Sequence, residues 1–498
     1  MIDELTISAS KKEIYEKLKK IYKPNFSNDY KLIVYYNEDI INNINFQGKF
    51  LENFISILAE IDFPTFFVTI KSNYENLLRD LKHLNLIYKN GIVNIDESSQ
   101  PFTILKESKN TFCVYPWMHF YFDPQGQINA CCSADINYPL GDYKNDVIDF
   151  NSPNIKKFRQ TLINNEMAPQ CSSCYKKEDL GLVSNRLAAN KRFFNYIPAS
   201  PEATVEHFKL RFLDIRLSNL CNLKCRMCSS NLSSKIAAED FKIWGDTRFL
   251  YNSNNKICEQ KLLELCKDQI NNIETIYFAG GEPLLSDFHY LLLNLLIENN
   301  KTNVKIEYNT NFTKIDQVLD YWSNFTNVTV GASIDLCGPA ANYVRNGVEY
   351  DVIKSNYFKL AESHKHINFT ITSVLSLYNV FNLCDLQLEW LSNIGLSQNN
   401  LSVKILTNPD NMSITVLPYE LKQKAQQRIE NHIEYLTKLN ANNLIHQWQA
   451  AINLMNNVDN SHLLKSFFVD NDIRDKIRNQ NFENYFPEFK NLRQYIDV

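Results

Sequence analysis

Strand-like and helix-like patterns alternate along the chain from residue 211 onward, and this alternation constrains the fold more than any other feature. Three of the intervening helical stretches are residues 286–298, 350–363 and 383–392. The six strand candidates are residues 211–217, 274–279, 305–309, 328–334, 369–375 and 401–406. Strands that are separated by helices form parallel sheets. We therefore expect an α/β fold over residues 205–415, with its sheet open or curled into a partial barrel.

The remaining sequence divides into three parts. Residues 1–105 carry apolar runs at 32–36 and 66–70 between helical patterns at 48–61 and 74–84, which predicts a small α/β unit without a chemical motif. A cysteine-rich, aromatic segment fills residues 106–200 and ends at a proline-containing linker. Residues 416–498 are polar, and their pattern predicts a helical C-terminal extension.

Composition and charge exclude several classes of protein. The 498 residues include 52 Lys and Arg against 56 Asp and Glu, a net charge of -4, which argues against a nucleic-acid partner. No apolar run approaches the ~20 residues of a spanning helix, so we expect no membrane segment. The N-terminus has no apolar signal region, which predicts a cytoplasmic protein. The 12 cysteines would lie in that reducing compartment, where clustered cysteines are expected to bind metal or act in catalysis rather than form disulfides.

The strongest motif is a loop of three cysteines directly after the first expected strand. Cys221, Cys225 and Cys228 have the spacing C-x3-C-x2-C. Thiolates bind iron–sulfur clusters, and a [4Fe–4S] cluster takes four protein ligands when it is fully coordinated. Three cysteines leave one iron free to chelate a small molecule. A zinc site would need a fourth cysteine or histidine nearby, and the loop has none.

This loop, together with the end of the next strand, resembles the radical S-adenosylmethionine (SAM) superfamily. The sequence Gly280-Gly281-Glu282-Pro283 resembles the GGEP motif that holds the SAM amino group in that superfamily. The chemistry agrees, because glycines allow a ligand to approach the backbone and Glu282 places an anion near an ammonium. The resemblance implies a partial (βα)6 TIM-like barrel of the radical SAM type, a [4Fe–4S] cluster and bound SAM.

Further SAM contacts are implied at the following strand ends. Asn311, Ser333 and Asp335 resemble the ribose- and carboxylate-contacting positions of the superfamily. Arg345 resembles an arginine that meets the SAM carboxylate in related maturases. The alternative for each of these residues is a strand-end polar group that is satisfied within the protein.

A second set of cysteines precedes the barrel. Cys113, Cys131, Cys171 and Cys174 could hold zinc or a [4Fe–4S] cluster, and their spacing alone favours neither. The set resembles the SPASM/twitch module, which implies an auxiliary [4Fe–4S] cluster, although that module usually follows the barrel. The G-x4-C spacing from Gly126 selects Cys131, with Cys132 as the alternative. We expect the five other cysteines to be buried and inert: Cys132, Cys258, Cys266, Cys337 and Cys384.

The resemblance implies an enzyme that cleaves SAM reductively and forms a 5′-deoxyadenosyl radical for hydrogen abstraction. A flavodoxin- or ferredoxin-type protein would be the reductant, and a peptide is the first choice of substrate. One alternative is a radical SAM enzyme acting on a small molecule such as a nucleoside or sugar. Another is a non-catalytic iron–sulfur redox sensor or electron carrier, but a sensor needs no SAM pocket.

Overall fold

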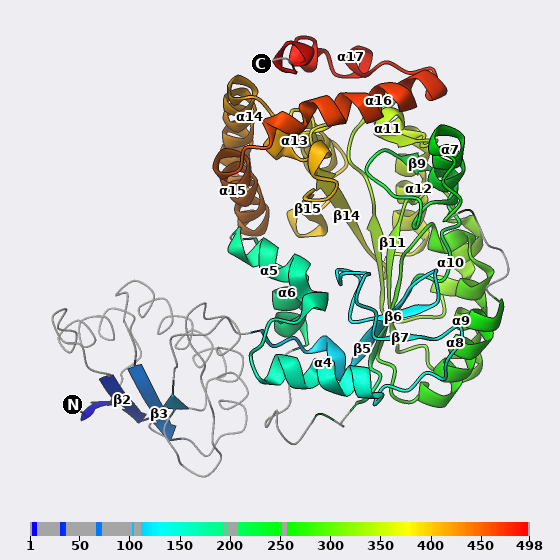
Figure 1. The fold of residues 1–498 in the computed structure, drawn as a ribbon, viewed down its shortest axis with the longest axis vertical. Coiled ribbons are helices and arrows are strands. Elements are labelled where there is room, and N and C mark those ends of the chain that lie inside the picture. Colours follow the sequence, from blue (N-terminus) through cyan, green and yellow to red (C-terminus); the bar gives the residue numbers. More distant parts are fainter. Residues whose placement is uncertain are drawn as a thin grey trace. The chain divides into compact units, whose positions relative to one another are not determined.

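The structure of the chain is a computed structural model. It describes residues 111–496 with short gaps at 181, 194–195, 197–204, 206–207, 249 and 251–255, and four strands before residue 111. The chain divides into two compact units (Figure 1), which are treated separately below. The first comprises residues 1–117, 155–175 and 183–207, and the second comprises residues 118–154, 176–182 and 208–498.

The first unit contains a small sheet near the N-terminus. Strands β1 (Ile2–Thr6), β2 (Tyr30–Tyr35) and β3 (Phe66–Lys71) are parallel, and β4 (Phe102–Thr103) pairs antiparallel with β3. The predicted strands at 32–36 and 66–70 are therefore confirmed. The predicted helices at 48–61 and 74–84 and the linker around Pro198 lie outside the described residues.

Helix α6 (Asn185–Arg192) and most of α4 (Pro153–Ile163) belong to this unit, and α5 (Ser172–Asp179) is divided between the two units. Ser184 caps α6 by accepting a hydrogen bond from the backbone N–H of Leu187 at 3.1 Å. Asn190 of α6 accepts a bond from the N–H of Val114 at 2.8 Å and donates one to the carbonyl of Phe112 at 2.9 Å. These bonds fix the backbone on both sides of Cys113.

The second unit is built on a nine-stranded sheet with the order β15-β14-β12-β11-β10-β8-β5-β6-β7. The six strands from β8 to β15 in this sheet are parallel, as predicted. They are β8 (Phe212–Ile215), β10 (Thr275–Phe278), β11 (Lys305–Thr310), β12 (Val328–Ala332), β14 (Asn368–Leu375) and β15 (Leu401–Ile405). This parallel α/β sheet confirms the predicted fold class.

Three strands of the cysteine-rich segment extend this sheet, which the sequence analysis did not predict. β5 (His119–Phe122) pairs parallel with β8, and β6 (Gln127–Asn129) and β7 (Gly141–Asp142) follow antiparallel. The turn between β5 and β6 is closed by Asp123, whose carboxylate accepts bonds from the N–H groups of Gln125 and Gln127, both at 2.9 Å. Strands of two to four residues carry too little periodicity to be found from sequence.

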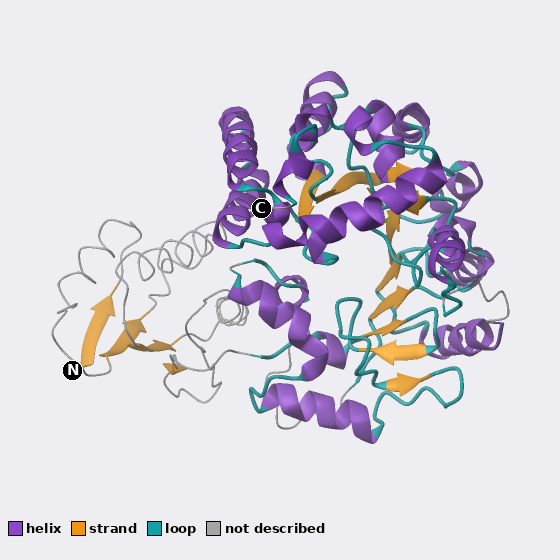
Figure 2. Cartoon of the chain, turned by 45° about the horizontal axis from the view of Figure 1, so that its top comes forward, coloured by secondary structure: helices purple, strands orange, loops and turns teal. Residues whose placement is uncertain are grey.

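Helices line the outer side of the curved sheet (Figure 2). The apolar residues of alternate strand positions face them, and Ile276, Ile306 and Val330 are fully buried. The helices that follow the strands are α7 (Ser234–Trp244), α8 (Lys256–Gln269), α9 (Asp287–Glu298), α10 (Asp316–Trp322), α11 (Gly338–Val344), α12 (Tyr350–Ser363) and α13 (Leu383–Leu388).

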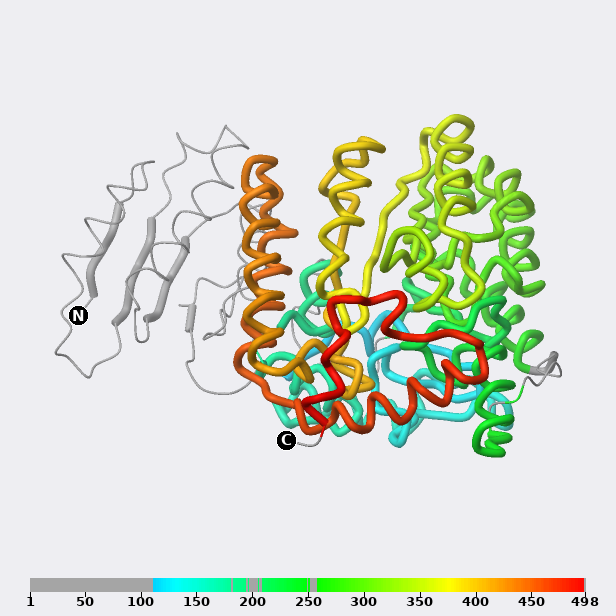
Figure 3. Tube along the Cα trace, turned by 90° about the horizontal axis from the view of Figure 1, so that it is seen from above, coloured from blue at the N-terminus to red at the C-terminus, as the bar shows by residue number. Residues whose placement is uncertain are grey.

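The C-terminal segment is helical, as predicted. Its helices are α14 (Tyr419–Lys438), α15 (Asn442–Asn457), α16 (Leu464–Arg478) and α17 (Phe482–Tyr485). α14 and α15 lie side by side as a hairpin (Figure 3). In the part of the chain that the structure describes, no helix combines the length and apolar character that crossing a membrane requires.

Candidate active site

The three-cysteine loop leaves the C-terminal end of β8, the first of the six parallel strands. Ligands of parallel α/β sheets bind at this end of the strands. Within the loop, the short strand β9 (Lys224–Cys225) pairs antiparallel with β13 (Arg345–Asn346), so that Arg345 lies opposite Cys225. The N–H of Cys228 donates to the carbonyl of Cys225 at 3.1 Å, and this bond closes a turn between the two residues.

The start of α7 holds the loop from the other side. The N–H of Cys221 donates to Ser234 Oγ at 3.2 Å, and Ser233 Oγ donates to the carbonyl of Leu223 at 2.9 Å. The side-chain amide of Asn219 donates to the carbonyl of Ser230 at 3.0 Å. Hydrogen bonds therefore connect the start of the loop to its end and to the start of α7, which gives the cysteines defined positions.

The three thiols lie close enough to affect one another's ionisation. Burial raises the pKa of Cys221 to about 11 and that of Cys228 to about 12, and in both cases a charge on Cys225 adds to the effect. Burial also raises the pKa of Cys225, although the charge of Arg345 opposes it. Among the described residues no three His, Cys, Asp or Glu side chains are arranged to hold a single metal ion. The three neighbouring thiols, of which Cys221 is buried and Cys225 and Cys228 are partly exposed, are nevertheless the ligand type that an iron–sulfur cluster takes.

The turn after β10 brings Gly280, Gly281 and Glu282 against this loop. The N–H of Gly281 donates to the carbonyl of Ser218 at 3.2 Å, and that of Glu282 donates to the carbonyl of Leu220 at 2.7 Å. Gly280 has φ +112°, a conformation that favours glycine, and a Cβ atom on Gly281 would lie 2.2 Å from the carbonyl oxygen of Leu220. Both glycines are thus required by the geometry.

The carboxylate of Glu282 is buried beside this turn. Oε1 accepts bonds from Thr310 Oγ1 at 2.6 Å and from the N–H of Leu284 at 3.2 Å, and Oε2 accepts one from the N–H of Asn311 at 2.7 Å. Burial raises the pKa of Glu282 to about 7, although these bonds oppose the shift. A ligand with an ammonium group would favour the ionised form of this carboxylate.

Asn311 and Ser333, which the sequence analysis assigned to SAM, lie at the same end of the sheet. The side chain of Asn311 donates to Asn222 Oδ1 at 2.8 Å and accepts from Thr313 Oγ1 at 2.7 Å. Asn222 lies between the first two cysteines, so its bond to Asn311 connects the loop to the end of β11. Nothing in the sequence distinguishes Asn222 from the other asparagines as a residue of the site. Ser333 donates to Asn309 Oδ1 at 3.2 Å in an exposed position.

Asp335 and Arg345 form an ion pair, with Arg345 Nε 2.7 Å from Asp335 Oδ2. The sequence predicts both residues as SAM contacts, with no bond between them. Asp335 Oδ1 also accepts the N–H of Val374 at 2.8 Å, and Arg345 Nη1 lies 3.8 Å from Cys225 Sγ. The pair therefore places a guanidinium beside one thiol of the loop.

The second cysteine set is divided between the two units. Within the first unit, burial raises the pKa of Cys113, and charges on Cys171 and Cys174 raise it further, so these three thiols are neighbours. Cys171 ends a short 3-10 helix (Pro169–Cys171) directly before α5, and Cys174 lies in the first turn of α5. These three buried thiols are likewise the ligand type that an iron–sulfur cluster takes. Cys131 and Cys132 belong to the second unit, and all four ligands of this set remain predictions.

The expectation for the five other cysteines is only partly confirmed. Cys258, Cys266 and Cys384 are buried, as predicted. Cys132 is exposed and Cys337 is partly exposed, so burial was the wrong prediction for both. Both lie in loops, where apolar periodicity gives no information on burial.

The inner face of the parallel strands is polar. The register aligns Tyr277 with both Asp214 and Glu307, and all three side chains can form hydrogen bonds. Arg216 pairs with Asp214 at 3.0 Å and lies over the rings of Tyr121 and Tyr277. Further polar residues of this face are Lys305, Asn309, Thr329, Thr370, Thr372, Ser402 and Lys404. An apolar core would exclude such residues, so this face suits a polar ligand.

Family models match both cysteine-containing regions. The model of the radical SAM superfamily matches residues 215–387, and that of the SPASM iron–sulfur cluster-binding domain matches residues 113–175. The chain therefore has a radical SAM domain, with a SPASM domain N-terminal to it. These domains imply a [4Fe–4S] cluster with SAM and an auxiliary iron–sulfur cluster, which confirms the predicted cofactors. No curated protein sequence matches this chain significantly.

Several solved structures are similar to this one at a low level. anSMEcpe with bound AdoMet and Cp18Cys peptide is 19% identical over 47% of this chain and 61% of that chain, with a TM-score of 0.33. TYW1 with a lysine–pyruvate adduct is 13% identical over 46% of this chain and 71% of that chain, with a TM-score of 0.24. Spore photoproduct lyase with dinucleoside spore photoproduct is 13% identical over 44% and 66%, with a TM-score of 0.26. The chain thus spans about three fifths of anSMEcpe.

Proposed function

We propose that this chain is a radical SAM enzyme. The observation that carries the proposal is the meeting of Cys221, Cys225 and Cys228 with the Gly280–Gly281–Glu282 turn at the end of the parallel sheet. When bound, the cluster and SAM supply reductive SAM cleavage, which provides a radical that abstracts hydrogen from a substrate. Formation of 5′-deoxyadenosine by the reduced protein tests this proposal.

The residues of the site have distinct roles in this proposal. The three thiolates hold the cluster, and the ionised Glu282 accepts the SAM ammonium while Thr310 and the backbone of Asn311 hold its carboxylate in place. Gly281 lets the turn approach the cysteine loop. Ser333 and Asn311 contact the ribose side of SAM, and Arg345, held by Asp335, approaches the SAM carboxylate.

We assign the auxiliary cluster to Cys113, Cys131, Cys171 and Cys174. The proximity of Cys113, Cys171 and Cys174 supports three of the four ligands. Cys131 is preferred to Cys132 because of its spacing from Gly126. The reductant is of the flavodoxin or ferredoxin type, and the 12 free thiols suit a reducing cytoplasm.

We further propose that the substrate is a peptide. The support is the inner face of the sheet, where hydroxyl and amide side chains can bond to the donors and acceptors of a peptide backbone. Thr329, Thr370, Thr372 and Ser402 are partly exposed on this face, and Asn309 is exposed. A nucleoside or sugar is the alternative, because the same groups can bond to its hydroxyls.

Deuterium transfer distinguishes these substrates. The reduced protein is incubated with SAM and with a deuterated peptide encoded by a short open reading frame beside the gene. Because the radical abstracts hydrogen only from an atom in near contact, we expect deuterium in 5′-deoxyadenosine with the peptide. Transfer from a deuterated nucleoside or sugar, with none from the peptide, would replace the peptide proposal while leaving the radical chemistry in place.

A further inference from the structure

Arg226 lies between the second and third cysteines of the loop, and its side chain is fully buried, with 0% exposure. A buried guanidinium is destabilising unless its donors and its charge are matched. Its position next to Cys225 means that whatever holds Arg226 also holds the backbone of the cysteine loop. The N–H of Arg226 itself donates to the carbonyl of Val344 at 2.8 Å.

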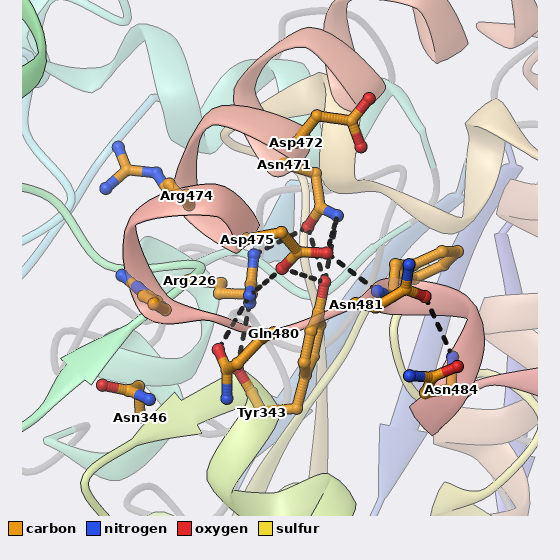
Figure 4. A network of polar contacts seen from close by, with 12 residues as sticks. Arg226, Tyr343, Asn346, Asn471, Asp472, Arg474, Asp475, Gln480, Asn481 and Asn484 are labelled. Atoms are coloured by element: carbon orange, nitrogen blue, oxygen red, sulfur yellow. Dashed lines mark hydrogen bonds and ion pairs between the residues drawn. The ribbon is translucent and has the colours of Figure 1, made fainter.

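The partners of the Arg226 side chain come mostly from the C-terminal segment (Figure 4). Its Nη1 donates to Asn471 Oδ1 at 2.9 Å, and its Nη2 donates to Asp475 and, at 3.0 Å, to Gln480 Oε1. Its Nε donates to the carbonyl of Tyr343 at 2.9 Å, and the guanidinium lies 3.7 Å from the centre of the Tyr343 ring. The guanidinium is therefore bonded from all three of its nitrogens.

These partners are themselves fixed. Asp475 accepts the Tyr343 hydroxyl at 2.8 Å on Oδ1 and the N–H of Phe482 at 2.8 Å on Oδ2. Asn471 accepts the hydroxyl of Tyr378 at 3.0 Å. The network connects α16, the start of α17 and the end of α11 around one arginine of the loop, and such connected buried networks hold a single geometry.

A second contact binds α16 to the helix that follows the loop. Arg474 donates to Glu239 at 2.8 Å and to Asp240 at 2.9 Å, and Arg478 pairs with Glu239. Lys224 of the loop lies 3.3 Å from the same Glu239 carboxylate. α16 thus holds both the middle of the cysteine loop and the helix at its end.

We propose that Arg226 is a positioning residue for the cluster held by Cys221, Cys225 and Cys228, and that α16 forms part of the cluster site through Asp475 and Asn471. The inference rests on the proposed function in taking these cysteines as the cluster ligands, and its expected iron count also takes the auxiliary cluster as present. Arg226 acts through the backbone: it fixes the segment between Cys225 and Cys228, and with it the separation of their sulfurs. Groups that orient metal ligands in this way tune metal retention.

Iron release from the reconstituted full-length protein tests the role of α16. We compare the wild type with Asp475→Asn, which keeps the shape of the side chain but removes its charge, and follow transfer of iron to a ferrous chelator. We expect about half of the iron to leave roughly tenfold faster in the variant, because the loop is less well held, while the other half leaves at the wild-type rate. The matched control is Asp472→Asn, which lies on the same helix and pairs with the exposed Arg493.

A second variant separates positioning from simple stabilisation. In the double variant Arg226→Met with Asp475→Leu, apolar side chains replace the buried pair, which often preserves stability. We expect its unfolding temperature to stay close to that of the wild type while its iron release is still accelerated. Wild-type iron release in this variant, or in Asp475→Asn, would overturn the proposal. Failure of the wild type to cleave SAM would instead count against the proposed function, since iron release is measured without turnover.

Discussion

Gly281 illustrates at the scale of one residue how closely the SAM turn and the cysteine loop approach each other. A Cβ atom at this position would lie 2.2 Å from the Leu220 carbonyl oxygen and 2.8 Å from a backbone carbon of Asn219, neither of which can move alone. We expect Gly281→Ala to destabilise the protein by about 1–3 kcal/mol, as overpacking does, and to reduce cluster content. Urea unfolding and iron analysis would measure both effects.

The control for this substitution is Gly141→Ala. A Cβ atom there would lie 3.4 Å from the flexible end of Ile128, and the residue does not have a positive φ. Its stability and iron content should match those of the wild type. If Gly281→Ala behaved like this control, the close approach of turn and loop would not be required for the site.

At the residue scale, the motifs could be predicted from the sequence, whereas the tertiary contacts that hold them in place could not. The three cysteines and the GGEP turn were identifiable because their spacing is local. The pairing of Asp335 with Arg345 and the attachment of Arg226 to Asp475 depend on tertiary contacts, the latter across 249 residues. No local pattern distinguishes an arginine that will be buried in such a network from one on the surface.

At the scale of elements, Glu239 joins α7 to α16. Burial opposes its ionisation, but the hydrogen bond and charge of Arg478 and the charges of Lys224 and Arg474 outweigh burial and lower the pKa of Glu239 to about 2. Because this pKa lies below its ordinary value of 4.5, the ionised form stabilises the folded state above about pH 4.5. That stabilisation is lost as the pH falls toward 2.

Glu239→Gln should therefore lower the free energy of unfolding at pH 7 by about 3 kcal/mol, because the buried Arg474 and Arg478 lose the negative charge with which they pair. The difference from the wild type should be smaller at pH 4, because at that pH Glu239 takes up a proton in the unfolded chain, where its pKa is the ordinary 4.5, but not in the folded protein. Urea unfolding at the two pH values measures both differences. Asp246→Asn, at a loop pair with the exposed Arg248, is the control and should change little. A pH-independent difference for Glu239→Gln would contradict the assigned role.

The elements themselves show why the sheet was only partly predictable. The six parallel strands were predictable because apolar strand patterns alternate with helical patterns, such as that of α9 with its buried Leu292, Leu293 and Leu296. β5, β6 and β7 are two to four residues long, and their place beside β8 follows from pairing rather than from their own sequence. Edge pairing of this kind is a property of the assembled sheet.

At the scale of the whole molecule, the two proposed clusters need two separate groups of cysteine ligands. One group is the three-cysteine loop at the end of β8, and the other includes Cys113, Cys171 and Cys174. If each group holds a [4Fe–4S] cluster, the anaerobically reconstituted protein contains about eight irons. This number depends on both groups, whereas SAM cleavage depends on the loop.

SAM cleavage by the variant that lacks all three loop cysteines tests the central claim most directly. Cys221, Cys225 and Cys228 are replaced together by Ala, and 5′-deoxyadenosine formation is measured after reduction with dithionite. The account predicts that the wild type forms 5′-deoxyadenosine, whereas the variant forms none and keeps about four irons, those of the auxiliary cluster. A triple variant that still cleaves SAM would contradict the assignment of the active site.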